Sequence, residues 1–129
     1  MTVPIQSDVD IVAVRQKGRA IATQLGFSTG DSTLIATAIS ELARNIISYA
    51  KKGEILLRTV ENKEKRGIEV VAQDDGPGIL NIRMAMQDGF STSGSLGMGL
   101  PGVRRLMDEF EIESQVGQGT RVSIKKWQR

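Results

Sequence analysis

Hydrophobic residues recur along this chain at two spacings, one typical of helices and the other of strands. Between residues 8 and 25 they return every three or four positions, which predicts a helix that Gly26 closes. A second helical run starts at residues 28–31, which carry a helix-start signal, and continues to about Ala50. This second run has the stronger apolar stripe, so it should pack a long helix against the core.

Shorter apolar runs are bounded by turn residues and predict strands. The expected strands cover residues 3–6, 54–60, 67–73, 109–115 and 120–127. The polar residues 61–66 should form a hairpin loop between two of them. Two further helices are expected, over residues 81–86 and 101–108, with Pro101 in the first turn of the latter. Early helices followed mostly by antiparallel strands predict an α+β fold, in one domain spanning residues 1–129.

Composition removes several kinds of chemistry. The chain has 129 residues, a net charge of +2, no cysteine and no histidine. Thiolate and imidazole groups are therefore excluded, and acid–base chemistry must fall to Asp, Glu, Lys or Tyr. Lys and Arg are scattered rather than clustered, so no nucleic-acid partner is expected. No segment is apolar enough to span a bilayer or to form a signal core, which predicts a cytoplasmic protein with no membrane partner.

The segment DDGPG, at residues 74–78, follows an apolar strand directly. Two carboxylates, Asp74 and Asp75, stand at the strand end, and Gly76 and Gly78 flank a proline. Such a turn can present an acceptor oxygen to a ligand and let the ligand approach the backbone closely. Taken alone, an ordinary tight turn has the same sequence.

A polar pair interrupts the amphipathic pattern of the long helix. Glu41 and Asn45 are four residues apart and lie on one ridge. Asn45 falls inside the edge of the apolar stripe and Glu41 just beyond it, so the amide must find partners. A satisfied boundary Asn beside a solvated Glu is the alternative.

A glycine-rich segment, residues 94–102, leads into a predicted helix start. Exposed backbone N–H groups and the positive end of the helix dipole suit an anion there. Hydroxyl groups precede it on Ser91, Thr92 and Ser93. Small polar residues give little to pack, so residues 89–97 should be disordered without nucleotide. A last glycine pair, at Gly117 and Gly119, predicts a hairpin turn before Thr120, whose hydroxyl could also reach a ligand.

The order of these four motifs resembles the GHKL nucleotide-binding superfamily, which includes the ATPase domains of gyrase, Hsp90, MutL and histidine kinases. The resemblance covers residues 31–125. Within the superfamily, the chain is most similar to the small bacterial serine protein kinases of the anti-sigma and switch-kinase type. Two segments carry that likeness: ISELARNI at residues 39–46 and GMGLPGVRR at residues 97–105.

The resemblance implies a two-layer, Bergerat-type α/β sandwich with a mixed, mostly antiparallel sheet covered on one face by helices. It also implies ATP and Mg²⁺ as ligands. By similarity, Asp74 accepts a hydrogen bond from the adenine amino group, Asn45 holds Mg²⁺ and Glu41 is the general base. Nucleotide contacts are further implied for Gly76, Gly78, Ile79, Ser91, Thr92, Ser93, Gly94, Gly97, Met98, Gly99, Leu100 and Thr120, with Thr120 and the glycines after Ser93 at the phosphates.

The implied activity is that of an ATP-dependent protein serine/threonine kinase. Its expected substrates are STAS-domain proteins of a bacterial stressosome-type module, after which the kinase would bind a downstream effector as a partner switch. The alternative is an anti-sigma factor that sequesters a sigma factor, binds ATP or ADP and phosphorylates an anti-anti-sigma protein. A nucleotide-binding module without turnover and a plain ATPase also remain open.

Overall fold

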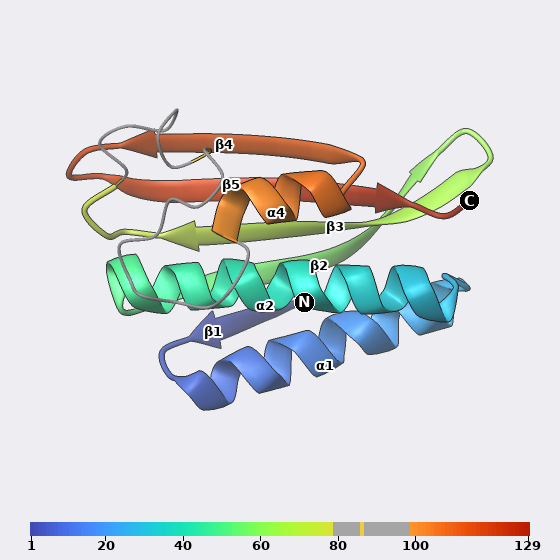
Figure 1. Ribbon diagram of the computed structural model, residues 1–129, viewed down its shortest axis with the longest axis horizontal. Coiled ribbons are helices and arrows are strands. Elements are labelled where there is room, and N and C mark those ends of the chain that lie inside the picture. Colours follow the sequence, from blue (N-terminus) through green and yellow to red (C-terminus); the bar gives the residue numbers. More distant parts are fainter. Residues whose placement is uncertain (79–85, 87–98) are drawn as a thin grey trace.

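The computed structural model describes residues 1–78, 86 and 99–129, which form a sheet with helices on one of its faces (Figure 1). In chain order the elements are β1 Thr2–Ile5, α1 Asp8–Leu25, α2 Thr29–Ala50, β2 Gly53–Asn62, β3 Lys65–Asp74, α4 Gly99–Leu106, β4 Glu109–Gln115 and β5 Gly119–Trp127. Apart from Met86, the helix expected over residues 81–86 lies outside the described residues. In the parts that are described, no helix is both long and apolar enough to cross a membrane.

Within the described residues, five strands lie in the order β1-β2-β3-β5-β4, and all four of their pairings are antiparallel. The predicted α+β fold, with a sheet covered on one face by helices, is confirmed. Among the described strands, however, the sheet is wholly antiparallel and not mixed. The register between β3 and β5 sets Asp74 directly opposite Thr120. Two motifs that are far apart in the sequence therefore meet at one end of the sheet.

The core lies between the sheet and α2. Successive turns of α2 bury Ile35, Ile39, Leu42 and Ile46 almost completely, as the apolar stripe predicted. The sheet contributes side chains from the inner strands, among them Ile55, Leu57, Val70, Val122 and Ile124. Each such side chain contributes about 1.5–3 kcal/mol through burial, so the orientation of α2 on the sheet is firmly set. Residues at the edge of its stripe then have fixed positions.

Helix ends follow the sequence signals in α1 and α2. Gly26 closes α1 in the left-handed conformation, with φ 95°. The hydroxyl of Ser28 accepts a hydrogen bond of 3.1 Å from the Asp31 N–H and begins α2. These two caps explain why α1 ends and α2 begins where the sequence predicted.

The prediction for α4 was wrong at both ends, because the helix runs from Gly99 to Leu106 rather than over residues 101–108. Lys126 Nζ donates to the Leu106 carbonyl at 2.9 Å, and the Asp108 N–H donates to the Lys125 carbonyl at 3.0 Å. Asp108 is thus already engaged with β5. A lysine on a distant strand supplied the stop, which local sequence could not indicate.

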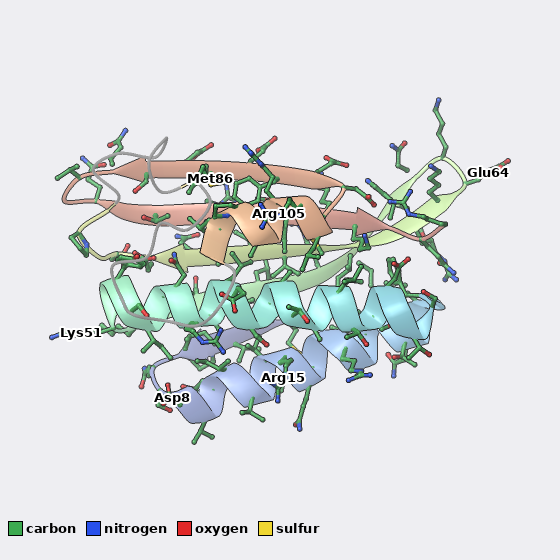
Figure 2. The ribbon with its side chains drawn as sticks, viewed as in Figure 1. Asp8, Arg15, Lys51, Glu64, Met86 and Arg105 are labelled. Atoms are coloured by element: carbon green, nitrogen blue, oxygen red, sulfur yellow. The ribbon has the colours of Figure 1, made fainter. Side chains whose placement is uncertain are left out.

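The expected loop over residues 61–66 was also wrong, since β2 continues to Asn62 and β3 starts at Lys65. Only two residues turn, and Lys63 has a positive φ of 55°. Figure 2 shows Glu64 at the tip of this hairpin, beyond the helical layer. Once the inner register is fixed, backbone pairing continues outward through polar residues, because ladder hydrogen bonds do not need apolar side chains.

The face of the sheet away from the helices carries a row of alternating charges. Arg58, Glu69, Lys125 and Glu109 are successive partners across β2, β3, β5 and β4. Glu69 forms ion pairs with Arg58 and with Lys125, and Lys125 lies 3.9 Å from Glu109. The row lies opposite the helical layer, so it does not take part in the site described next.

Candidate functional site

The candidate site starts on α2, where Glu41 is held from two sides. Arg44 Nη1 lies 2.5 Å from Glu41 Oε1, and the Gly99 N–H donates to Glu41 Oε2 at 3.3 Å. Gly99 is the first residue of α4, which packs beside α2 (Figure 1). The Glu41 side chain is 10% exposed. A nearly buried carboxylate therefore lies at the junction of the two helices.

Asn45 lies one turn after Glu41 on the same ridge of α2 and is half-buried. Its side-chain amide offers a neutral oxygen, a ligand type that suits Mg²⁺, which is commonly bound through one or two protein groups together with substrate phosphates and waters. The donor set on this ridge therefore fits the ion. Within residues 1–78, 86 and 99–129, no group of three or more His, Cys, Asp or Glu is placed to hold a metal.

Asp74 closes β3 at the other end of the site. Its Oδ1 accepts a hydrogen bond of 2.9 Å from the Gly76 N–H. Burial raises the pKa of the Asp74 carboxyl above its ordinary value, and the nearby charge of Asp75 adds to this. The backbone amides of Gly76 and Thr120 act in the opposite direction. The side chain is thus a partly desolvated acceptor fixed by the turn that follows it.

Two glycines allow this turn to fit between neighbouring elements. A Cβ on Gly76 would lie 2.6 Å from the Cβ of Ala50, at the end of α2. Gly78 has φ 78°, and a Cβ there would lie 2.3 Å from the Gln115 carbonyl oxygen. Both positions need glycine for packing within the protein. Their contact with the adenine ring of a nucleotide remains a prediction.

Thr120 is buried opposite Asp74, and its hydroxyl lies 2.8 Å from the hydroxyl of Ser114 on β4. The sequence did not single out Ser114. Nothing local could have done so, because the strand register brings the two hydroxyls together. Thr120 therefore lies at the Asp74 end of the site and not beside Glu41.

Helix α2 sets the distance between the two ends. The turn after Asp74 touches Ala50, and a helix rises about 1.5 Å per residue. Asn45 then lies about 7 Å, and Glu41 about 13 Å, from that contact along the axis. The site is elongated, with Asp74 and Thr120 at one end, Asn45 between, and Glu41 with the start of α4 at the other.

Of the other residues predicted to contact nucleotide, some are described by the structure and the rest are not. Gly99 meets Glu41, whereas Leu100 is buried in the core. Ile79, Ser91, Thr92, Ser93, Gly94, Gly97 and Met98 lie outside the described residues, as does the disorder expected over residues 89–97. Arg44 was missed, although an opposite charge three residues after Glu41 on a helix is a recognisable signal.

A cavity of about 310 Å³ lies against the same turn but on its β1 side. Its lining is formed by Pro4, Gln6, Ala50, Lys52, Gly53, Glu54, Gln73, Asp74 and Asp75. None of Glu41, Asn45 and Thr120 lines it, so the cavity adjoins the elongated site along α2 only at the Asp74 end. Figure 2 shows Lys51, the residue before Lys52, at the end of α2 next to this corner.

Comparison with known proteins identifies the family of this chain. Residues 30–129 match the family model of the histidine kinase-, DNA gyrase B- and HSP90-like ATPases. The chain belongs to this family. The predicted GHKL membership is thereby confirmed, and the match includes all four motifs. Membership of a family of ATPases implies that the chain binds nucleotide. That the nucleotide lies along α2 remains a prediction.

Two curated relatives indicate the activity more specifically than the family model does. The chain is 56% identical over 127 residues to the serine/threonine-protein kinase RsbT of Bacillus subtilis, covering 98% of this chain and 96% of the relative. The predicted enzyme class, a protein serine/threonine kinase, is confirmed at this level of similarity. The chain is also 38% identical over 114 residues to an anti-sigma F factor of Caldanaerobacter subterraneus, covering 84% of this chain and 78% of the relative.

Among solved structures, a mycobacterial sensor histidine kinase, MprB, matches with a TM-score of 0.59. The alignment covers all of this chain and 97% of the other, at 15% identity. This likeness supports the fold alone. It agrees with the antiparallel sheet and one-sided helical layer described above.

Proposed function

We propose that this chain transfers the γ-phosphoryl group of ATP to a serine or threonine of a STAS-domain protein in a bacterial stressosome-type module. After the transfer, it binds a downstream effector as a partner switch. The observation that carries the proposal is the position of Glu41, held nearly buried at the end of the site farthest from Asp74. The similarity to RsbT supports the class of reaction.

Asp74 is assigned to the adenine end. Its carboxylate accepts a hydrogen bond from the exocyclic amino group, with the ring lying against Gly76, Gly78 and Ile79. Thr120, which is opposite Asp74 in the sheet, is assigned to the same end rather than to the phosphates. The partly desolvated environment of Asp74 supports this role, because an acceptor shielded from water binds a ligand donor more strongly.

The phosphate end is assigned to Asn45 and to the segment that leads into α4. Asn45 would hold Mg²⁺ through its amide oxygen, and the ion, when bound, neutralises charge on the phosphates. Backbone amides at Gly94, Gly97 and Gly99 and the hydroxyls of residues 91–93 would donate to phosphate oxygens. Phosphoryl transfer requires mainly positioning and charge neutralisation, which these groups supply.

Glu41 is assigned as the general base. It accepts the proton of the substrate hydroxyl as that oxygen forms a bond to the γ-phosphorus. The bond from the γ-phosphorus to the β–γ bridging oxygen breaks, and ADP leaves with that oxygen. Glu41 later returns the proton to solvent. General-base assistance of this kind typically contributes 10²–10⁴-fold to the rate, so roughly that factor should depend on the Glu41 carboxylate.

The first test is transfer of label from γ-labelled ATP to a STAS-domain protein. Wild type should label the partner on serine or threonine, and Glu41→Ala should reduce labelling at least about 100-fold. Circular dichroism and a thermal melt confirm that the variant is folded. Equal labelling by the two proteins would contradict the assignment of Glu41.

A second candidate is favoured by the similarity to anti-sigma F factors. In that case the chain would sequester a sigma factor and phosphorylate an anti-anti-sigma protein. A pull-down with purified sigma factors, in ATP and in ADP, separates the two functions. Nucleotide-dependent retention of a sigma factor favours the anti-sigma function, whereas labelling of a STAS partner without such retention favours the switch kinase.

A further inference from the structure

We propose that Arg44 is a positioning residue for Glu41 during phosphoryl transfer, an inference that rests on the proposed function. Arg44 Nη1 is 2.5 Å from Glu41 Oε1, one helical turn along α2. The Glu41 side chain is 10% exposed and that of Arg44 40%. The carboxylate therefore lies inward, toward the site, and the guanidinium approaches it from the solvent side.

The contact with Arg44 limits the orientation of the Glu41 carboxylate and leaves it able to accept a proton. Arg44 engages Oε1, and the Gly99 N–H engages Oε2 at 3.3 Å. A carboxylate oxygen has two lone pairs, so each oxygen keeps one that can accept a proton from a substrate hydroxyl. A guanidinium stays protonated and only donates, which means that Arg44 cannot compete with Glu41 as a base. The arrangement is that of a base held ready in one orientation.

Of the two contacts, the one from Arg44 does not depend on the start of α4. The Gly99 N–H is at the start of α4, where a phosphate oxygen would compete for it with Oε2. Arg44 lies on α2 together with Glu41, so its contact does not require any particular position of α4. If phosphate takes the Gly99 amide, the contact with Arg44 is the one of these two that still limits the three side-chain torsions of Glu41. Its loss should therefore slow the transfer step more than it weakens binding.

Ion pairs at this spacing are common on helices and contribute little to stability, so a stability measurement alone would not test the role. The chain provides a matched control. Arg58 also pairs with a nearly buried glutamate, Glu69, whose side chain is 8% exposed, but this pair lies on the face of the sheet away from the helices. Arg44→Gln and Arg58→Gln each remove a charge that faces a nearly buried glutamate, and only the first is next to the site. Glu69 keeps a second cation, Lys125.

The experiment measures kcat and KM for phosphorylation of the STAS-domain protein, together with ATP affinity by calorimetry. For Arg44→Gln we expect kcat to fall at least tenfold, with ATP affinity and the KM for the protein within about twofold of wild type. Arg44→Lys, which keeps the charge, should recover part of the loss. Arg58→Gln should have the kcat of wild type.

Other results overturn the inference. An unchanged kcat in Arg44→Gln, or an equal fall in Arg58→Gln, would show that the pair is only structural. A rise in kcat would show that Arg44 restrains the base, and a change confined to KM would make it a docking residue. If wild type transfers no phosphate at all, the proposed function fails first and the inference with it.

Discussion

At the scale of single residues, the site has a carboxylate at each end, in different environments. Asp74 is partly desolvated at a strand end, and among the described residues its hydrogen-bond donors are the backbone amides of Gly76 and Thr120. Glu41 has a cationic partner, Arg44, and one amide from Gly99. The first environment suits an acceptor that recognises a donor on the ligand, and the second suits a base held in a fixed orientation. The different roles proposed for them follow from these surroundings.

The two adjacent aspartates should differ in nucleotide binding. Asp74→Asn removes a charged acceptor and should lower the affinity for ATP about 10–100-fold, since a hydrogen bond to a charged group contributes about 1.5–3 kcal/mol. Asp75→Asn is the matched control and should change affinity by about twofold or less. Isothermal titration calorimetry on both variants makes the comparison. The same affinity in both would contradict the assignment of the adenine end.

Asp74 should also lower the stability of the protein at neutral pH. Burial raises the pKa of the Asp74 carboxyl in the folded state, so the folded protein accommodates the protonated side chain better than the charged one. The stability that comes from the protonated form is fully present below the unfolded pKa and is lost as the pH rises through the folded pKa. Without nucleotide, Asp74→Asn should therefore be more stable than wild type at pH 7. The gain should shrink as the pH falls toward about 4, the ordinary carboxyl range. Urea unfolding across this interval tests the sign, and a gain that grows toward acid pH would refute it.

At the scale of elements, the hairpin between β4 and β5 determines where Asp74 lies. Gly119 has φ 104°, and a Cβ there would lie 2.0 Å from the Asp74 carbonyl oxygen. Gly117 has φ 83°, but a Cβ there would meet nothing within 4 Å. The Gly117 N–H also donates to the Pro77 carbonyl at 2.8 Å. The glycine turn and the Asp74 turn are thus packed together as one unit.

These two glycines make a matched pair for a stability test. Gly117→Ala should cost about 1 kcal/mol, the penalty of a left-handed backbone. Gly119→Ala adds a backbone clash and should cost about 3 kcal/mol in total, with a loss of ATP affinity because Asp74 moves. Chemical denaturation and calorimetry measure both effects. Equal costs at the two positions would show that the close packing on Asp74 is not important.

The sequence predicted the elements better than their edges. The stripe of α2 and the caps at Gly26 and Ser28 depend on local chemistry, which the sequence contains directly. The stop of α4 depends on Lys126, and the length of the β2–β3 hairpin depends on pairing set elsewhere in the sheet. Within the site, too, the sequence predicted local relations and missed those that depend on distant parts of the chain. Glu41 and Asn45 could be placed together by helical spacing, whereas the position of Thr120 opposite Asp74 required the strand register.

At the scale of the whole molecule, the sheet carries helices on one face and paired charges on the other. The site lies within the helical layer, because α2 supplies Glu41 and Asn45, the end of β3 supplies Asp74 and the start of α4 supplies Gly99. A ligand along α2 would touch every element that carries a motif. This arrangement brings together motifs that are far apart in the chain.

The most direct test of this account is a single-turnover measurement. The protein is loaded with γ-labelled ATP, mixed with the STAS-domain partner and quenched over time, for wild type and for Glu41→Gln. We expect both proteins to bind the same amount of nucleotide, with transfer to the partner at least about 100-fold slower in the variant. Transfer at the wild-type rate by nucleotide-loaded Glu41→Gln would contradict the account.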